Sequence, residues 1–594
     1  MEKRAADILM STLVDLGVTD CFAVVGGGAM HLNNALALND NIDKYFMHHE
    51  QSCSMAADSY ARISGKPALV CVTSGPGATN AITGVMGAWV DSIPMIVISG
   101  QVRTGISVQS SGLPLRYRGI QEFDIVSSVS NMTKYAKRIE DPLCIKAEIE
   151  KAYQIAMEGR RGPVWLDIPL DVQSAIVDSG ELVSYPSCHA VESLSDKELG
   201  FVIESITNSE RPCVLAGSGI IAGDALEELD EFINKNNLPI VGGAWISDVY
   251  YNEHPLFFGL SGNIGPRAGN YILQNADLIL VIGNSLGFRQ TGFNPESFAP
   301  HAKIIMVDAD ENEAKKPELC IDHIVRSDVK QFLSRINQSD VALGASSVWL
   351  DYCRSVYSAL DPFEGANGAQ DDERVCSYCF WEEFNRCAPE DAIVCLGNNT
   401  ANSTKLQVGK EKKEQRVVTN YACGSMGFDL PAAIGACVAS GREVFCITGD
   451  GTIMMNLQEM QTIKHYDLPI KVVVFSNDGY NAIRQTCANY FDGLYIGCTE
   501  ETGVSFPSFQ EVADLFGFEY MRCRTNGELE RVLLEFFKQE GRVLLEVDQR
   551  LDDPVSPKLM SKLLPDGSFS APLLEEMHPF LPDDMQKAFM PEWD

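Results

Sequence analysis

Two polar residues that can bind a metal ion follow apolar strands in the last third of the chain. Asp450 stands in a Gly449-Asp450-Gly451 triplet after the run EVFCIT, and Asn477 follows the next run, IKVVVFS. In a parallel sheet both strand ends meet at one edge, so a carboxylate and an amide oxygen would lie together. Such oxygen ligands suit Mg²⁺, which also binds phosphate oxygens. The glycines and the N-terminus of a helix expected over MMNLQEMQTIKHY would approach a diphosphate closely.

A Gly-Asp-Gly triplet alone is also typical of an ordinary turn after a strand. Here the apolar strand before the triplet and the Asn at the end of the following strand favour a ligand site over a bare turn. The spacing therefore predicts a site for Mg²⁺ and a diphosphate.

A parallel sheet is needed to position these residues, and the chain repeats the pattern of such sheets three times. In the first third, residues 4–16 are helix-periodic, and CFAVVGG, ALVCVTSGPG and MIVISGQ are apolar runs that end in turns, up to GPVWLDIPLDVQ, where two prolines are expected to stop regular structure. Four runs of this kind follow in the middle third and four in the last third. Such runs are typical of parallel strands buried on both faces. The sequence predicts an α/β fold of three consecutive doubly wound parallel-sheet domains.

Two polar segments mark the boundaries between these domains. Residues 177–197 and the stretch DPFEGANGAQDDER at 361–374 are expected to be linkers. The predicted units are an N-terminal domain at 1–176, a central nucleotide-type domain at 195–345, a C-terminal domain at 372–551, and a tail at 552–594 that lies over the body.

Composition excludes several classes of protein. The formal net charge of −34 over 594 residues disfavours nucleic-acid binding. We expect neither a signal peptide nor a membrane span, because no apolar stretch has the required length. The 18 cysteines are scattered through apolar segments, which favours reduced thiols and a cytoplasmic location. Cys376 and Cys379 have C-x-x-C spacing, but no second pair or histidine pair accompanies them, which favours two buried thiols over a metal or redox site.

Longer motifs resemble those of acetolactate synthases, a family of thiamine-diphosphate enzymes. They are HEQSCSMAADSYARISGKPALVCVTSGPGATNAITG at 49–84, DSIPMIVISGQV at 91–102, MGFDLPAAIGA at 426–436 and GDGTIMMNLQEM at 449–460. The resemblance extends over essentially the whole chain. It implies pyrimidine-binding, central and diphosphate-binding domains in that order, with thiamine diphosphate and Mg²⁺ as cofactors. It also implies a homodimer or homotetramer with active sites shared between subunits.

The activity implied is that of a carboligase. Such an enzyme decarboxylates a 2-keto acid, here expected to be pyruvate, and transfers the acyl carbanion equivalent to an acceptor carbonyl. The resemblance makes Glu50 the activator, whose carboxyl group hydrogen-bonds the aminopyrimidine ring of the cofactor. By composition alone, a Glu in this position is an ordinary helix N-terminal charge.

The resemblance assigns further roles to matching positions. Met426 would lie beneath the cofactor and bend it, although an apolar core residue is the simpler interpretation. Gln101 and Gln121 match glutamines near the reacting carbon, and a surface amide is the alternative for Gln121. Asp450, Asn477 and the Gly479 carbonyl would bind the metal. The remaining residues expected to line the cofactor are Gly28, Pro76, Gly77, Asn80, Gly424, Gly449, Gly451, Thr452 and Tyr480.

The central domain raises the question of a flavin, because acetolactate synthases keep an FAD there that does no net redox work. Positions that match flavin contacts are Arg160, Gly217, Gly219, Arg289 and Asp308. Each of these residues also fits an ordinary loop at the end of a strand. FAD is expected on the strength of the resemblance.

Three departures from the family pattern fall in the acceptor half of the site. Leu170 replaces a lysine, Ile120 replaces a phenylalanine and Thr486 replaces a tryptophan. The changes predict a wider and less cationic acceptor pocket. The segment NDGYNAIRQTCANYFDG also resembles the branch of surface-polysaccharide and branched-sugar pathways, in which the acceptor is a keto-sugar nucleotide. There Arg484, Thr486 and Asn489 would face sugar hydroxyls.

Two other functions remain open on the sequence. A plain 2-keto acid decarboxylase would release an aldehyde instead of joining two carbonyl compounds. A non-enzymatic binding protein would have kept the fold and lost the chemistry, but Glu50, Asp450 and Asn477 are all present.

Overall fold

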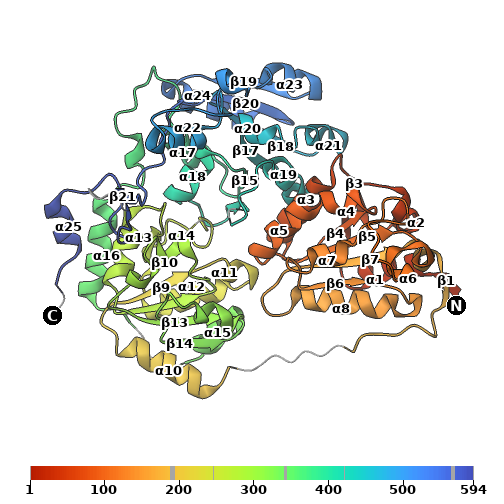
Figure 1. Ribbon diagram of the computed structural model, residues 1–594. Coiled ribbons are helices and arrows are strands. Elements are labelled where there is room, and N and C mark those ends of the chain that lie inside the picture. Colours follow the sequence, from red (N-terminus) through yellow and green to blue (C-terminus); the bar gives the residue numbers. More distant parts are fainter. Residues whose placement is uncertain are drawn as a thin grey trace.

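The computed structural model describes residues 2–186, 194–244, 246–339, 344–420, 422–563 and 569–592, so part of the expected 177–197 linker lies outside the described residues. The chain forms three lobes, each built on its own sheet (Figure 1). Within the described residues each of these sheets has six strands, all parallel. The predicted α/β fold of three parallel-sheet domains is confirmed.

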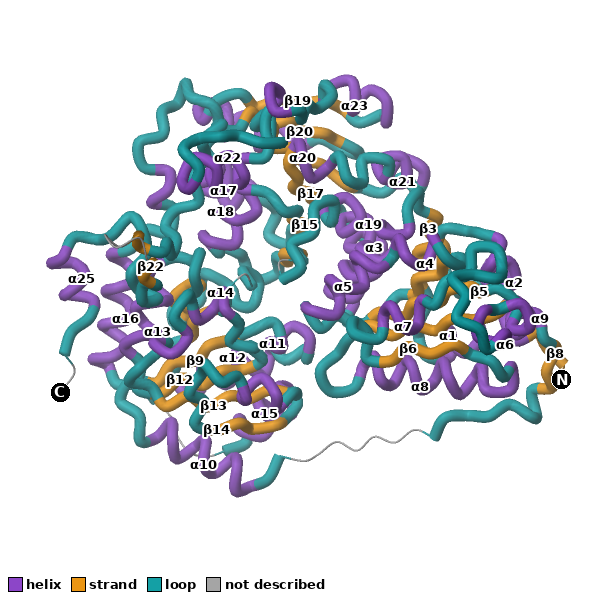
Figure 2. The backbone as a smooth tube through the Cα atoms, in the orientation of Figure 1, coloured by secondary structure: helices purple, strands orange, loops and turns teal. Residues whose placement is uncertain are grey.

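The first sheet has the strand order β3-β2-β4-β5-β7-β6. Neighbouring residues of a strand enter opposite cores: Leu69 and Cys71 of β4 pack on one face, and Val70 and Val72 on the other. The sheet is therefore covered on both faces, as Figure 2 shows. The strands are β2 (Asp20–Ala23), β3 (Asp43–Phe46), β4 (Leu69–Val72), β5 (Met95–Gln101), β6 (Tyr135–Arg138) and β7 (Pro163–Pro169). The helices that concern the site are α1 (Ala5–Asp15), α3 (Glu50–Ser64), α4 (Pro76–Asn80), α5 (Ile82–Val90) and α9 (Leu170–Ser174).

The second sheet has the order β11-β10-β9-β12-β13-β14, which is the order of dinucleotide-binding folds. The C-terminal tail lies on this lobe, since Leu559, Leu574 and Met577 share its core, and helix α25 lies beside α13 and α16 (Figure 1). The strands are β9 (Pro212–Ala216), β10 (Ile240–Gly242), β11 (Phe257–Leu260), β12 (Leu278–Ile282), β13 (Lys303–Asp308) and β14 (His323–Arg326). The helices named here are α10 (Asp196–Thr207), α13 (Arg267–Asn275), α16 (Ser347–Ala359) and α25 (Asp583–Phe589).

The third sheet, β16-β15-β17-β18-β20-β19, repeats the topology of the first. In both, the strand order reverses between the first and third strands along the chain, and such a switch point is where α/β sheets bind ligands. The strands are β15 (Ile393–Leu396), β16 (Arg416–Val418), β17 (Val444–Gly449), β18 (Ile470–Ser476), β19 (Glu519–Cys523) and β20 (Val543–Asp548). The helices near the site are α17 (Ser377–Cys387), α18 (Thr400–Val408), α19 (Asp429–Ser440), α20 (Asp450–Ile453), α21 (Glu459–His465) and α22 (Asn481–Tyr490).

The strands that the apolar runs did not predict are mostly edge strands. β3, β6, β14, β16 and β19 lie at sheet edges and leave residues partly exposed, so their sequences are less apolar than those of central strands. β11 is also an edge strand, but it is buried and only four residues long.

Two local predictions were wrong. The prolines of GPVWLDIPLDVQ do not stop regular structure; they are the first and last residues of the fully buried strand β7, a position at which a missing N–H is tolerated. The stretch MMNLQEMQTIKHY is not one helix. Helix α20 already begins at Asp450, and turns separate it from α21.

The first and third lobes share one hydrophobic core. Helix α3 packs on α19, and Val70 and Val97 of the first sheet belong to the same buried cluster as Val444 and Val472 of the third. The two helices approach so closely that a Cβ atom at Gly435 would lie 1.9 Å from the carbonyl oxygen of Ala56.

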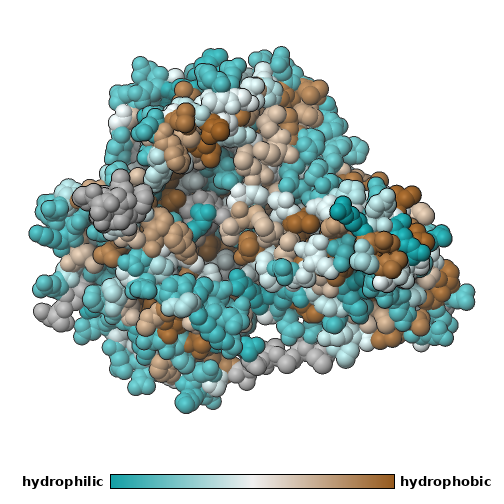
Figure 3. Space-filling model, viewed as in Figure 1, coloured by the Kyte–Doolittle hydropathy of each residue, from teal (hydrophilic) through white to brown (hydrophobic). Residues whose placement is uncertain are grey.

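No helix within the described ranges is long and apolar enough to cross a membrane. Hydrophilic residues dominate the face drawn in Figure 3, and hydrophobic residues on it form separate small groups.

The contact of α3 with α19 predicts that a methyl group added at Gly435 lowers the free energy of unfolding. Gly435→Ala should destabilise the protein by about 1–3 kcal/mol, because the added carbon meets backbone that cannot turn away. The control is Gly200→Ala in α10, where a Cβ atom meets nothing within 4 Å; this change should be neutral or stabilise by up to about 1 kcal/mol. Urea unfolding of the variants measures both effects, and equal stabilities would contradict the packing.

Candidate active site

The candidate metal ligands lie together at the carboxyl edge of the third sheet. Asp450 follows β17 and Asn477 follows β18, and these strands are neighbours. The Oδ2 atom of Asp450 accepts hydrogen bonds from the backbone N–H groups of Asn477 (2.9 Å) and Gly479 (3.4 Å), and Oδ1 accepts one from Gly451 (2.8 Å). The Asp450 carboxylate is therefore brought against the backbone of Asn477 and Gly479 at this edge.

Asp450 is the acidic residue among the candidate metal ligands, and its burial affects its pKa. Burial raises the pKa of the Asp450 carboxyl to about 6, although three backbone N–H groups favour the charged form. No group of three or more His, Cys, Asp or Glu side chains that could hold a metal ion occurs within the described ranges. A cation here would rely on one carboxylate, neutral oxygens and the phosphate oxygens of a ligand, which is a set that suits Mg²⁺.

The glycines of the triplet have two different neighbours. A Cβ atom at Gly449 would lie 3.2 Å from the Cβ of Asn399, at the loop after β15. A Cβ atom at Gly451 would lie 2.2 Å from the Tyr480 ring. Gly451 therefore makes room for Tyr480, and this packing by itself accounts for a glycine there.

A buried carboxylate that the sequence analysis did not single out supports the same turn. Asp429, at the start of α19, accepts hydrogen bonds from the hydroxyl groups of Thr448 (2.8 Å) and Thr452 (3.1 Å). Burial raises its pKa to about 6. The Thr452 hydroxyl also accepts a hydrogen bond from Gly427 N (2.8 Å). In the sequence, Asp429 stands out as an acid inside the apolar motif MGFDLPAAIGA, and this could have indicated a buried polar role.

The loop that carries Met426 is held at both ends. Gly424 and Gly427 both have positive φ (63° and 81°). The Gly424 carbonyl accepts a hydrogen bond from Asn398 (2.5 Å), and the Gly427 carbonyl accepts one from Asn456 (2.8 Å). Met426 is half-buried between these anchors.

Glu50 lies at the switch point of the first sheet. It is the first residue of α3, only 9% exposed, and its Oε2 atom accepts a hydrogen bond from Asn80 at the end of α4 (3.0 Å). A Cβ atom at Gly77 would lie 3.2 Å from the other carboxylate oxygen. Gly28 N donates to Thr73 after β4 (3.0 Å). The structure thus places Gly77 and Asn80 of α4 beside this carboxylate, and Thr73, which contacts Gly28, lies next to Gly77. Pro76 is the first residue of α4.

Asn456 joins the helix of Glu50 to the loop of Met426 within one chain. Its side-chain amide donates to Gly427 O and to the Gln51 side chain (3.2 Å), and its oxygen accepts a hydrogen bond from Ser52 (3.0 Å). Gln51 and Ser52 directly follow Glu50. The helix of the proposed activator and the loop of Met426 are therefore connected through one buried side chain, which the sequence analysis did not single out.

The two predicted glutamines differ in their surroundings. Gln101, at the end of β5, is buried, and its amide nitrogen donates to Phe123 O (2.8 Å) and to Asp167 (3.1 Å), while its oxygen accepts from Val102 N (2.9 Å). Gln121 is exposed and has a φ of 58°. A catalytic role for either residue stays a prediction.

The acceptor-side residues are largely exposed. Ile120 is 88% exposed, and Thr486 and Asn489 lie on the exposed side of α22, whereas Leu170 at the start of α9 is half-buried. Arg484 has a different position: its guanidinium donates to the backbone oxygen (2.9 Å) and side-chain oxygen (3.2 Å) of Asn477. It borders the candidate metal site.

A cavity of about 460 Å³ lies where the three lobes meet. Side chains from all three lobes line it, and two of its arginines are paired with acids of the same wall, Arg62 with Asp91 and Arg416 with Asp248. Its size fits a small-molecule ligand. The wall contains polar and basic residues. They include Arg62, Arg161, Ser218, Asn284, Arg289 and Arg416. Of the residues expected to contact a flavin, Arg289 lines this cavity.

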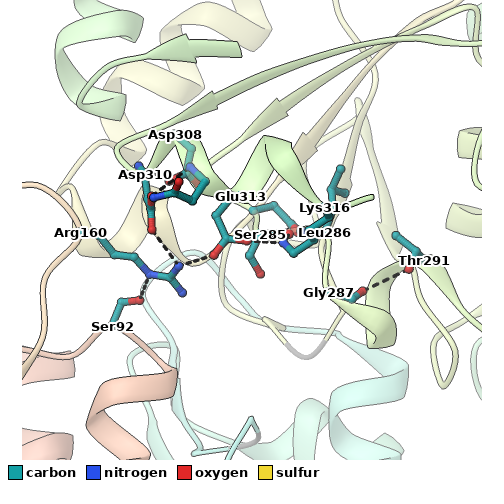
Figure 4. Close-up of polar contacts among 12 residues, drawn as sticks. Ser92, Arg160, Ser285, Leu286, Gly287, Thr291, Asp308, Asp310, Glu313 and Lys316 are labelled. Atoms are coloured by element: carbon teal, nitrogen blue, oxygen red, sulfur yellow. Dashed lines mark hydrogen bonds and ion pairs between the residues drawn. The ribbon is translucent and has the colours of Figure 1, made fainter. Parts of the chain in front are cut away.

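The other expected flavin contacts have partners of their own. Arg160 donates to Ser92 (2.8 Å) and pairs with Glu313 and Asp310, as Figure 4 shows. Asp308 accepts a hydrogen bond from Asp310 N (2.9 Å), and burial raises its pKa. Cβ atoms at Gly217 and Gly219 would lie within 2.2–2.6 Å of Gly283, so the close approach of two strand-end loops accounts for both glycines.

The comparisons with known proteins cover all three lobes. Residues 3–127 match the N-terminal TPP binding domain of thiamine pyrophosphate enzymes, residues 199–336 match their central domain, and residues 397–547 match their C-terminal TPP binding domain.

Among curated proteins, the chain is similar to acetolactate synthase isozyme 1 large subunit of Escherichia coli K12, with 27% identity covering 96% of this chain and 97% of that protein. It is 29% identical to probable acetolactate synthase 2, chloroplastic, of Oryza sativa, covering 94% and 85%. It is also 29% identical to the acetolactate synthase large subunit of Corynebacterium glutamicum, covering 86% and 81%. With all three domains matched in order on three parallel sheets, the chain belongs to the thiamine pyrophosphate enzyme family.

Proposed function

We propose that the protein is a thiamine-diphosphate- and Mg²⁺-dependent carboligase that decarboxylates pyruvate and adds the remaining two-carbon unit to an acceptor carbonyl. The observation that supports this most is the position of Asp450 and Asn477 after neighbouring strands of the third sheet, in a chain whose three lobes match the domains of thiamine pyrophosphate enzymes. The relatives named acetolactate synthase support the type of reaction. The chain is further proposed to act as a homodimer or homotetramer.

The residues present fit the proposed cofactor. Asp450, Asn477 and the Gly479 carbonyl would hold Mg²⁺ against the diphosphate, beside Gly449, Gly451 and Thr452. Glu50, with Asn80 and Gly77 beside it, would hold a proton at one carboxylate oxygen and pass it to and from the aminopyrimidine. Met426 would hold the cofactor bent. Thiamine diphosphate, when bound, supplies the carbon nucleophile and the electron sink for decarboxylation.

Replacing the Glu50 carboxyl with an amide tests the activator. Glu50→Gln keeps the size and one hydrogen-bond acceptor but cannot exchange a proton, so we expect intact folding and retained cofactor with a rate lower by on the order of 10²-fold or more. The measurement is steady-state pyruvate consumption with thiamine diphosphate and Mg²⁺ saturating.

The matched control is Glu227→Gln in the central domain, an exposed residue in the first turn of its helix. It should leave the rate unchanged. Near-normal turnover of Glu50→Gln would remove Glu50 from the mechanism.

The three-lobe cavity is proposed to hold FAD in a non-redox role, with Arg289 at its wall. The purified protein should then be yellow and release FAD on denaturation. Arg289→Ala should lower the FAD content roughly tenfold, as expected when a charged partner of a bound anion is lost. The control Arg531→Ala, at an exposed side chain of the third lobe, should not lower it. A colourless protein that cannot be reconstituted with FAD would overturn this part of the proposal.

A second candidate acceptor, a keto-sugar nucleotide, is favoured by the exposed side of α22, the helix that also carries Arg484. Thr486 and Asn489 on α22 expose polar side chains there, where the family pattern has a tryptophan in place of Thr486. A large polar acceptor would be accommodated more readily by this surface than by an indole.

Thr486→Trp separates the two acceptors. An added indole should cost a keto-sugar acceptor about 1–3 kcal/mol more than it costs pyruvate, so the ratio of the two kcat/KM values should change roughly 5–150-fold. Competition between the acceptors in the wild type and the variant measures the ratio, with Thr207→Trp on α10 as the control. An unchanged ratio would favour simple acetolactate formation.

A further inference from the structure

Gln549 reaches the candidate metal site through the register of the third sheet. Strands β18 and β20 are parallel neighbours in which Ser476 pairs with Asp548. The next residues are Asn477 and Gln549, and the Gln549 backbone N–H donates to Ser476 O (2.9 Å). Each strand therefore ends level with the other, and Gln549 comes to lie beside Asn477.

The Gln549 side chain determines which way the Asn477 amide faces. An asparagine amide can be turned to exchange its oxygen and nitrogen, and only the oxygen can bind a cation. Asn477 Nδ2 donates to Gln549 Oε1 (2.9 Å). Because Oε1 only accepts hydrogen bonds, the nitrogen of Asn477 faces Gln549 and its oxygen faces away from Gln549, where Arg484 donates to it (3.2 Å).

Asp553 in turn orients Gln549. Gln549 Nε2 donates to Asp553 Oδ2 (2.8 Å), which also accepts a hydrogen bond from Ser377 N at the start of α17 (3.1 Å). Gln549 is 1% exposed and Asp553 0%, so these bonds lie away from bulk solvent. A carboxylate acceptor at this point turns the Gln549 nitrogen toward Asp553 and leaves Oε1 for Asn477.

We infer that Gln549 and Asp553 are positioning residues that hold the Asn477 side-chain oxygen toward the metal. The inference rests on the Mg²⁺ site of the proposed function. Neither residue needs to contact the metal or the cofactor, since partners of metal ligands set ligand orientation and metal affinity from one shell further out.

The test is a titration of the full-length apoprotein with Mg²⁺ at saturating thiamine diphosphate, followed by calorimetry and, with Mn²⁺ as a probe, by electron paramagnetic resonance. Gln549→Leu keeps a similar volume but removes the acceptor for Asn477. We expect its metal affinity to fall about 10–100-fold. An affinity within about twofold of the wild type would overturn the inference.

Gln274→Leu is the matched control for the loss of a buried amide. Gln274 is 2% exposed and is hydrogen-bonded to Glu575 and Ala299 in the second lobe. This variant should lose thermal stability to a similar degree and keep its metal affinity. An equal loss of affinity in both variants would mean that general destabilisation, and not orientation, is being measured.

A second variant keeps the inference testable even if Gln549→Leu does not fold. Asp553→Asn keeps an oxygen that can accept from both Gln549 Nε2 and Ser377 N, so metal affinity should stay within about threefold of the wild type. An Asp553→Asn variant that binds as weakly as Asp450→Ala would contradict the inference. A wild type that binds no metal with thiamine diphosphate would instead overturn the proposed function.

Discussion

The candidate active site depends on the packing of α3 against α19. This contact joins the cores of the first and third lobes and brings the start of α3, with Glu50, beside the loop of Met426. It is possible only because Gly435 has no side chain where the helix backbone of Ala56 approaches. In the proposed oligomer with shared active sites, this core fixes the distance between the two half-sites that one chain contributes. That distance tolerates little error, because catalysis loses rate steeply when reacting groups move by even 1 Å.

The residues of both half-sites are positioned by the same strand topology. The first and third sheets have the same strand order, and the proposed functional residues follow strands at the switch point or next to it. In the third sheet, Asp450, Asn477 and Gln549 follow three neighbouring strands at one edge. In the first sheet, the loops after β2 and β4 meet near Glu50. The register of the sheet therefore brings the side chains of Asp450, Asn477 and Gln549 to one edge. The buried hydrogen bonds of these side chains then determine how each one is oriented.

Much of this arrangement was predictable from the sequence. Central strands are apolar runs followed by turns, so the parallel sheets and the meeting of Asp450 with Asn477 followed from pattern alone. Edge strands such as β3 and β19 are partly exposed, and their mixed composition hid them. Asn456 and Gln549 could not be assigned, because their roles depend on partners far away in the chain, such as Ser52 for Asn456. Asp429 could have been noticed, because it is an acid inside an apolar motif. The shared core of two lobes is likewise a contact between distant segments, and local periodicity carries no information about it.

The most direct test of the central claim is the product formed from pyruvate labelled with ¹³C at its carbonyl carbon. The full-length protein is incubated with thiamine diphosphate and Mg²⁺, with and without a keto-sugar nucleotide, and the products are identified by NMR and mass spectrometry. The account predicts loss of CO₂ and a new carbon–carbon bond at the labelled atom, in acetolactate or in a branched sugar. Labelled acetaldehyde as the sole product, or unchanged pyruvate, would contradict it.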